Sequence, residues 1–434
     1  MSIEKLLAAK GYLFHSDQPG IFLRCADTIL QYQTWNSTIS PVEVETSAPF
    51  GLIYAKENTP QGAELFYNKM RKNWRDFHFL PEVLTLCTSE CNLNCPYCLI
   101  GVQKGARYRY PSIAQLERAF QLFPVRNVEL TGGEPLAEKG KVEQILEWLI
   151  GRVEKCVLIT NGVGLDEAFW SILRRCSRHY DLRIRLTLSD ELSHMSPAEF
   201  ETQILPQARK SPDIKINLNF LPNHDGSGLT AFLRRVNELK LPPQITVAPI
   251  CLLKSEFSGP VTFDMENYIK EILEVVEHED EYLGRVNFFP EHDFGLLVHN
   301  PELVGCRRGK VTLCDQGYAL CNMTLQEGNF LAGPIETAQS SWEILSKPCQ
   351  GCEYYPDHCA EGIKSNQCFH FATGCLRCPT IYLCLLRCPY LLNANTADST
   401  NLNCLGHALL RVFALWLTQR NRCWKDIRGE TSAM

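Results

Sequence analysis

Short β-rich runs alternate with amphipathic helical runs from Val83 to Ile250, and this alternation restricts the fold more than any other feature of the sequence. Six runs predict strands, at residues 83–87, 128–130, 157–160, 182–188, 214–220 and 245–250. The helical runs between them include residues 112–123, 142–150, 167–176 and 230–239. Strands that alternate with helices usually form parallel βα units. The sequence therefore predicts an α/β fold whose six units close, or partly close, into a barrel.

The first predicted strand leads directly into three closely spaced cysteines. Cys91, Cys95 and Cys98 have the spacing C-x3-C-x2-C. Active sites in βα barrels lie at the carboxyl ends of the strands, which is where this loop begins. A cubane iron-sulfur cluster has four irons, so three thiolate ligands leave one iron open to a small molecule. A zinc site is the weaker interpretation, because structural zinc takes four ligands.

These cysteines and a second motif resemble the radical S-adenosylmethionine superfamily. Tyr97, directly before the third cysteine, fits the family's aromatic position near the adenine. A GGEP segment follows the second predicted strand, and in the family this segment meets the amino group of the cofactor; here it is Gly132, Gly133, Glu134 and Pro135. The resemblance implies a partial (β/α)6 TIM-like barrel that binds S-adenosylmethionine and one four-iron, four-sulfur cluster. It also implies a reaction that begins with a 5′-deoxyadenosyl radical.

Polar residues on the later strands complete the predicted cofactor site. Asn161 follows the third strand, Ser189 ends the fourth, and Asn217 lies on the fifth. In the family, residues at such strand ends hold the ribose and carboxylate of the cofactor. A capped strand end or an Asx turn is an equally good interpretation of each residue taken singly.

The chain has 21 cysteines, and the second concentration of them lies after residue 300. In a reducing cytosol, so many cysteines indicate metal or cluster ligation more than disulfides. Cys375, Cys378, Cys384 and Cys388 have the spacing C-x2-C-x5-C-x3-C, and this region resembles the SPASM domain of radical enzymes. The resemblance implies two auxiliary four-iron clusters. It assigns Cys306, Cys321 and Cys388 to the first and Cys375, Cys378, Cys384 and Cys404 to the second, with Cys314 as an additional candidate ligand.

A further group of cysteines lies outside that pattern: Cys349, Cys352, Cys359 and Cys368. Four thiols so close together favour a metal, as a third auxiliary cluster or a zinc ion, or as substitutes for some of the ligands above. The isolated cysteines are best interpreted as small buried hydrophobes; they are Cys25, Cys156, Cys176, Cys251 and Cys423. Cys251 follows the sixth strand and is also a candidate hydrogen-atom donor.

Three domains are expected. Residues 81–290 form the radical core, and residues 300–434 form the cysteine-rich SPASM domain, which begins with a turn at Gly317 between Cys306 and Cys321. Residues 1–80 form a small mixed α/β segment with strand-like runs at Ile21–Arg24 and Gly51–Ala55 and a helical run from Ala63 to Asn73. By analogy with relatives, this segment is a candidate peptide-recognition module.

The expected activity is oxidative modification of a ribosomally synthesised precursor peptide, by a carbon-carbon or thioether crosslink, because SPASM proteins mostly act on peptides. The alternatives are an anaerobic sulfatase-maturating activity, a peptide epimerase that uses Cys251, and a non-catalytic electron carrier. The expected partners are the peptide or protein substrate and an electron donor such as a flavodoxin or ferredoxin.

Composition excludes other classes of partner. The formal net charge of −6 gives no reason to expect a nucleic-acid partner, because phosphate binding normally needs a basic surface. No apolar stretch is long enough to span a bilayer, and the first residues lack the pattern of a secretory signal. The sequence therefore predicts a cytoplasmic protein with no nucleic-acid or membrane partner.

Overall fold

The computed structural model describes residues 82–93, 107–189, 194–249 and 310–319, single positions between 264 and 275, and the backbone of five strands between Leu13 and Tyr54. The chain divides into two compact units. One contains Met1–His78, Phe288–Arg308 and Cys349–Met434, and the other contains Phe79–Asn287 and Gly309–Pro348.

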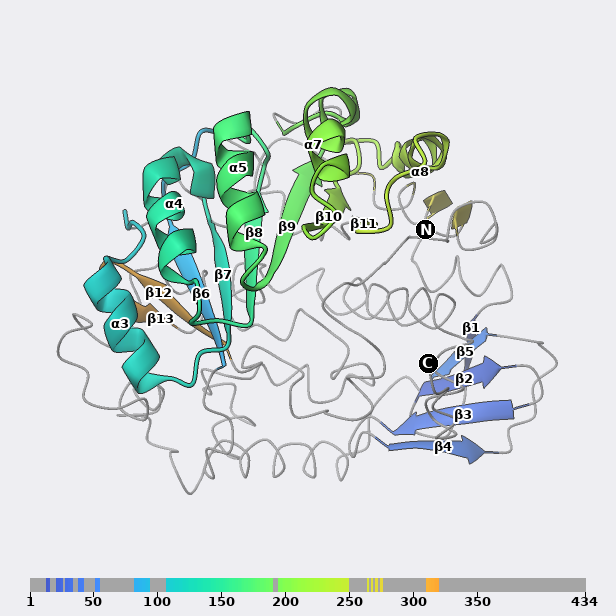
Figure 1. Cartoon of the computed structure of the whole chain (residues 1–434). Helices are drawn as coiled ribbons and strands as arrows, with labels where there is room; N and C mark the ends of the chain where they lie inside the picture. The colour runs from blue at the N-terminus through green and yellow to red at the C-terminus, as the bar shows by residue number, and fades with distance from the viewer. Residues whose placement is uncertain are drawn as a thin grey trace, which may run out of the picture. The chain divides into compact units, whose positions relative to one another are not determined.

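The first unit contains a small sheet of five strands (Figure 1). They are β1 (Leu13–His15), β2 (Ile21–Cys25), β3 (Thr28–Gln33), β4 (Thr38–Val42) and β5 (Gly51–Tyr54), in the order β1-β5-β2-β3-β4. Strands β1 and β5 are parallel and the other neighbours are antiparallel. The two strand-like runs expected in this segment correspond to β2 and β5, whereas the expected helix at 63–73 lies outside the described residues.

The second unit is built on a sheet of eight strands. They are β6 (Val83–Thr88), β7 (Asn127–Gly132), β8 (Lys155–Thr160), β9 (Asp181–Leu188), β10 (Lys215–Phe220), β11 (Ile245–Pro249), β12 (Lys310–Cys314) and β13 (Gly317–Ala319). Strands β6 to β11 are parallel and neighbour one another in chain order, as in the wall of a βα barrel. All six predicted strands are therefore present, and the predicted α/β partial barrel is confirmed.

Helices follow the parallel strands. They are α3 (Ile113–Leu122), η1 (Pro135–Glu138), α4 (Lys139–Trp148), α5 (Glu167–Cys176), α6 (Pro197–Glu199), the π-helical η2 (Phe200–Ile204), α7 (Leu205–Arg209) and α8 (Leu229–Glu238). Figure 1 shows α4 and α5 on one side of strands β6 to β8, and α3 near the β12–β13 hairpin. None of the helices within the described ranges is long and apolar enough to cross a membrane.

Burial along β9 shows which face of the sheet the helices cover. Leu182, Ile184, Leu186 and Leu188 are buried, whereas the residues between them are only half-buried. Side chains of a strand alternate between its two faces, so the leucine and isoleucine face packs under the helices. Fully burying each such side chain stabilises the fold by about 1.5–3 kcal/mol. The opposite face, which is the inside of the partial barrel, is polar.

Local sequence signals determine where the helices begin. At α3, the Ser112 side chain accepts from the backbone N–H of Gln115, while the Gln115 side chain accepts from the backbone N–H of Ser112. This capping box satisfies two backbone donors that the first turn leaves unpaired. At α5, Asp166 accepts from the N–H of Phe169 in the same way.

The hairpin β12–β13 extends the core sheet on the far side of β6. Strand β12 pairs with β6 in parallel, with Leu313 opposite Leu86, and is antiparallel to β13. The turn expected at Gly317 is present, and its φ of +148° is in the region that favours glycine. The sequence assigned these residues to the C-terminal domain, but their backbone hydrogen bonds join them to the first strand of the core.

Candidate active site

The carboxyl edge of the sheet brings together the first elements of the predicted site. The chain leaves β6 through a short stem, Thr88–Cys91, and Cys91 is half-buried at its end. The backbone N–H of Leu93 lies 3.4 Å from the Cys91 Sγ and donates to it. Cys95, Tyr97 and Cys98 lie outside the described residues, so one of the three predicted cluster ligands is placed.

The GGEP turn lies against this stem. The Gly133 N–H donates to the Thr88 carbonyl at 2.7 Å, and the Glu134 N–H donates to the Glu90 carbonyl at 2.8 Å. A Cβ on Gly132 would lie 2.1 Å from the Thr88 carbonyl oxygen, and a Cβ on Gly133 would lie 2.3 Å from that of Glu90. Gly132 also has a φ of +122°. The glycines are therefore required because the turn touches the backbone that carries Cys91.

The donors and acceptors of the turn fit the predicted cofactor contact. Both N–H groups at Gly133 and Glu134 are used inside the protein, so they are not the groups that would receive a ligand. Peptide carbonyl oxygens are acceptors, and an ammonium group carries only donors. The N–H groups of Gly133 and Glu134 are therefore not placed to bind an anion, and contact of the turn with the amino group of S-adenosylmethionine stays a prediction.

Glu134 connects the turn to the end of β8. Its carboxylate is only 1% exposed and accepts from the Thr160 hydroxyl at 2.6 Å, the Asn161 N–H at 2.7 Å and the Leu136 N–H at 2.9 Å. Burial raises the pKa of this carboxyl, while the three hydrogen bonds act in the opposite direction. These three partners are neutral donors, so hydrogen-bond geometry rather than ion pairing holds this carboxylate.

Asn161 links β8 to the residue that follows Cys91. Its Nδ2 donates to the Asn92 Oδ1 at 2.9 Å, and its Oδ1 accepts from the Val163 N–H at 2.9 Å. The second contact is the Asx turn that the sequence left open as an alternative. Asn161 is 5% exposed and therefore forms part of the frame around the cysteine stem.

Ser189 and Asn217 lie further along the sheet. Ser189 follows β9 and is buried, and its N–H donates to the Met195 carbonyl at 3.1 Å. Asn217 lies on the half-buried inner face of β10, where its Oδ1 accepts from the Thr246 hydroxyl at 3.1 Å. Their role as cofactor-binding residues stays a prediction.

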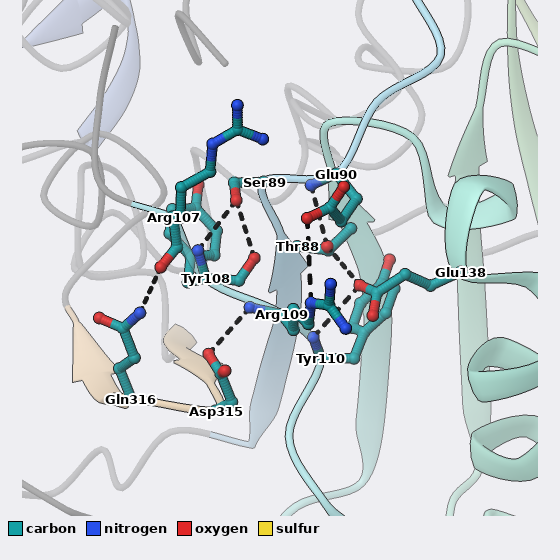
Figure 2. Close-up of polar contacts among 10 residues, drawn as sticks. All are labelled: Thr88, Ser89, Glu90, Arg107, Tyr108, Arg109, Tyr110, Glu138, Asp315 and Gln316. Atoms are coloured by element: carbon teal, nitrogen blue, oxygen red, sulfur yellow. Dashed lines mark hydrogen bonds and ion pairs between the residues drawn. The ribbon is translucent and has the colours of Figure 1, made fainter. Parts of the chain in front are cut away.

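Two tyrosines in the segment that returns from the cysteine loop form hydrogen bonds with the Cys91 stem and with the strand that leads into the GGEP turn. The N–H of Tyr108 donates to the Ser89 Oγ at 2.9 Å, and the Ser89 N–H donates to the Tyr108 carbonyl at 2.9 Å (Figure 2). The Tyr110 hydroxyl donates to the Thr131 carbonyl at 2.9 Å, directly before the GGEP turn. Burial, reinforced by Cys87 and Glu134, raises the pKa of Tyr110 well above its ordinary value, so its phenol stays neutral.

Glu138, at the end of η1, completes this frame. Its carboxylate accepts from the Thr88 hydroxyl and, at 3.5 Å, from the Tyr110 N–H (Figure 2). Sequence reasoning missed Thr88, Ser89, Tyr108, Tyr110 and Glu138. No local pattern marks them, because their partners lie in other segments of the chain.

Cys314, a predicted additional ligand, is buried at the end of β12 in a cluster with Cys87, Tyr108 and Ala319. Burial raises the pKa of its thiol to about 11. Its role as a ligand stays a prediction. The remaining predicted ligands lie outside the described residues: Cys306, Cys321, Cys349, Cys352, Cys359, Cys368, Cys375, Cys378, Cys384, Cys388 and Cys404. Cys251 also lies outside them. Cys156 and Cys176 are fully buried, as expected of small hydrophobes.

Sequence comparisons match the region that contains this site. Residues 85–188 match the family described as the Radical SAM superfamily. A GTP 3′,8-cyclase of Geobacter sulfurreducens is 36% identical over 86 residues, which are 18% of this chain and 26% of that protein. A probable GTP 3′,8-cyclase of Archaeoglobus fulgidus is 35% identical over 91 residues, 20% of this chain and 30% of that protein. The chain thus spans less than a third of the length of these curated relatives.

Structural comparison finds SuiB of Streptococcus suis. Its structure bound to S-adenosylmethionine matches with a TM-score of 0.50 and 13% identity, over 89% of this chain and 99% of SuiB. The structure of SuiB bound to the precursor peptide SuiA matches with a TM-score of 0.49 and 15% identity, over 82% of this chain and 83% of that one. At such low identity, the first match indicates a shared fold.

The family match begins within β6, includes Cys91 and the whole GGEP turn, and ends with Leu188 at the end of β9. It therefore covers the strands and loops around Cys91, the GGEP turn and Asn161, whereas Ser189 and Asn217 lie beyond its end. The chain thus contains a domain, residues 85–188, that matches the Radical SAM superfamily.

Proposed function

We propose that this chain is a peptide maturase that cleaves S-adenosylmethionine reductively and oxidatively modifies a ribosomally synthesised precursor peptide by a carbon-carbon or thioether crosslink. The observation that carries the cofactor part of the proposal is the contact of the GGEP turn with the Cys91 stem at the carboxyl edge of the sheet. An electron-carrying protein without catalysis has no use for such a turn beside an incomplete set of ligands.

Cys91, Cys95 and Cys98 would hold the four-iron, four-sulfur cluster of this site. The turn from Gly132 to Pro135 would receive the amino group of S-adenosylmethionine, with Tyr97, Asn161, Ser189 and Asn217 as its other predicted contacts. When bound, these two groups supply a 5′-deoxyadenosyl radical that abstracts hydrogen from a substrate.

The chain itself contributes position. Hydrogen bonds from three separate segments hold the turn and the Cys91 stem, and they include the Glu134 carboxylate and the Asn161 amide. Reacting atoms must be held close together in a fixed orientation for radical transfer to be efficient. A rigid frame of short hydrogen bonds serves this purpose better than mobile ion pairs.

The C-terminal cysteines support oxidation of a peptide. Their spacing resembles the SPASM domain, whose auxiliary clusters can accept an electron from a substrate radical. Cys306 and Cys321 flank the β12–β13 hairpin in the sequence. A fold match across 99% of SuiB supports an architecture of this kind. The group at Cys349, Cys352, Cys359 and Cys368 would hold a further cluster or a zinc ion.

The test is the mass of a small peptide encoded beside this gene, after coexpression with the chain under anaerobic, iron-replete conditions. We expect the peptide to lose two hydrogens, and fragmentation to locate the crosslink. The loss should disappear when Cys91, Cys95 and Cys98 are changed to Ala. An unchanged mass with a changed chirality would favour an epimerase, and formylglycine in a sulfatase would favour the sulfatase-maturating activity.

Likeness to GTP 3′,8-cyclases favours one second candidate, which is radical chemistry on a nucleotide. The likeness covers only 26% of the cyclase. Anaerobic incubation of the reduced enzyme with S-adenosylmethionine and GTP, without peptide, distinguishes the two candidates. Consumption of GTP with release of 5′-deoxyadenosine would favour the nucleotide.

A further inference from the structure

We infer that Asp315 and Gln316, at the turn of the β12–β13 hairpin, are positioning residues for the loop that carries the cluster ligands. The inference rests on the proposed cluster at Cys91, Cys95 and Cys98. It assigns to a segment far along the sequence the task of holding one end of that loop.

The contacts of the hairpin turn are with the return segment, Arg107–Tyr110. The Arg109 N–H donates to the Asp315 Oδ1 at 2.8 Å, and the Asp315 N–H donates to the Arg109 carbonyl at 2.9 Å. The Gln316 side-chain amide donates to the Arg107 carbonyl. Figure 2 shows both side chains directed at the backbone of this segment.

The same turn is also attached to α3. The Gln115 Nε2 donates to the Asp315 carbonyl at 2.9 Å, and Gln115 forms the capping box at the start of that helix. The return segment, the first turn of α3 and the hairpin turn therefore form one hydrogen-bonded unit.

This unit is bonded in turn to the stem of the cysteine loop. Tyr108 and Ser89 exchange backbone and side-chain hydrogen bonds of 2.8–2.9 Å, and Ser89 lies two residues before Cys91. The chain thus leaves at Leu93 and returns at Arg107 with both ends fixed, and Cys95 and Cys98 lie between them in the sequence. Fixing both ends of a loop reduces the conformations from which its ligands must be ordered.

Asp315 and Gln316 are themselves exposed. Exposed turn residues usually tolerate substitution, and an Asp in such a turn often serves only the turn itself. A role in the turn alone and a role in positioning the cysteine loop lead to different predictions. A residue that serves only the turn affects stability and leaves the cluster unchanged, whereas a positioning residue also affects the cluster.

The test uses the full chain, reconstituted anaerobically with iron and sulfide, and compares wild type with the double variant Asp315→Ala, Gln316→Ala. Four quantities are measured: iron bound per chain, the electron paramagnetic resonance spectrum of the reduced cluster with and without S-adenosylmethionine, the rate of 5′-deoxyadenosine release, and the melting temperature. We expect an altered spectrum and a rate about ten- to a hundredfold lower, as for a reacting group displaced by about an ångström. Asp315→Asn should retain most of the rate, because its amide oxygen can still accept from the Arg109 N–H.

Two controls separate position from stability. Arg109→Ala removes an exposed side chain whose ion pair with Glu90 is long, at 3.9 Å, but keeps the backbone held by Asp315, so spectrum and rate should not change. Asp166→Ala removes another carboxylate that accepts a backbone N–H, at the start of α5, and should lower the melting temperature while leaving the spectrum unchanged.

Two outcomes decide the inference. A changed spectrum and rate in the double variant, at a melting temperature like that of Asp166→Ala, support it. A wild-type spectrum and rate overturn it. If the double variant does not fold, Asp315→Ala alone carries the same comparison, because the backbone bond to Arg109 remains. A wild type that holds a cluster but releases no 5′-deoxyadenosine contradicts the proposed function instead, and the spectra still test the positioning role.

Discussion

The two edges of the parallel sheet hold carboxylates in opposite ways. At the carboxyl edge, Glu134 is 1% exposed and accepts hydrogen bonds from a hydroxyl and two backbone amides. At the amino edge, the Asp181 side chain is 29% exposed and pairs with Arg183 at 2.6 Å and Lys215 at 3.0 Å. Burial raises the pKa of Glu134, whereas these two cations hold the pKa of Asp181 below its ordinary value despite partial burial.

The difference shows that ion pairs near solvent and buried hydrogen bonds serve different purposes in this fold. Ion pairs near solvent contribute little and tolerate movement, because water and salt screen them. A buried carboxylate with three short hydrogen bonds has one arrangement that satisfies it, and any other arrangement leaves a buried polar group unpaired. The edge that carries Cys91 is thus the edge where geometry is most restricted.

The largest expected effect is at the glycine next to Glu134. Gly133→Ala would place a Cβ 2.3 Å from the Glu90 carbonyl oxygen and 2.9 Å from the Cys91 Cβ, so the stem must move. We expect 5′-deoxyadenosine release to fall by about a hundredfold or more. The free energy of unfolding should fall by about 1–3 kcal/mol, as for an overpacked core.

Gly140→Ala is the matched control, because a Cβ at this α4 position meets nothing within 4 Å. It should leave the rate unchanged and stabilise the helix by roughly 0.5–1 kcal/mol. Equal effects of the two substitutions on the rate would show that close approach of the turn to the stem is not required.

The next effect is the loss of the Glu134 carboxylate. Glu134→Gln replaces one of the two carboxylate oxygens with an NH2 group, which would face a partner that donates. We therefore expect the free energy of unfolding to fall by about 2–3 kcal/mol. Denaturant unfolding followed by circular dichroism measures it. A change within error would mean that the hydrogen bonds of Glu134 are replaced by water.

A smaller effect is expected at the opposite edge. Asp181→Asn removes the charge that pairs with Arg183 and Lys215, and at this partly exposed site the loss should be below about 1 kcal/mol. Added salt should reduce the difference in the free energy of unfolding between Asp181→Asn and the wild type. It should not reduce the corresponding difference for Glu134→Gln. A larger loss at Asp181 than at Glu134 would reverse the comparison.

The smallest effect is the dependence of stability on pH, and the two carboxylates should act with opposite sign. Because the pKa of Glu134 is raised, the folded state binds a proton that the unfolded state releases, so stability should fall as pH rises above the ordinary value of 4.5. Because the pKa of Asp181 is lowered, its contribution is present above 3.8 and should be lost as pH falls below that value. The free energy of unfolding, measured at a series of pH values, should depend less on pH above 4.5 in Glu134→Gln than in the wild type. Below pH 3.8, it should depend less on pH in Asp181→Asn than in the wild type. Unchanged slopes would contradict both assignments.

Much of the fold could be predicted because its signals are local. The run VEL at 128–130 predicted a strand that extends from Asn127 to Gly132, and the helix predicted at 167–176 has these bounds in the structure. Period-two burial in strands and capping residues at helix starts depend on neighbours a few positions away. The GGEP turn could be predicted for the same reason, since its four residues are contiguous.

The rest of the site could not be predicted, because its contacts join distant segments. Ser89 could be placed beside Tyr108 only once both ends of the cysteine loop were located. Asp315 lies in a segment that composition assigned to the cysteine-rich domain, and its bond joins it to Arg109, 206 positions earlier in the chain. An exposed Asp in a turn has the same local signal whether it serves the turn or a distant backbone.

The sequence by itself determined the six strands, the helices between them and the motifs at Cys91 and Gly132, since each depends on the period or chemistry of adjacent residues. Only the tertiary structure decided that β12 pairs with β6, that Glu134 and Asn161 tie the turn to β8, and that Asp315 holds the return segment. The physical reason is that hydrogen bonds between distant segments depend on which strands become neighbours, and this is decided by burial across the whole sheet rather than by any local run of residues.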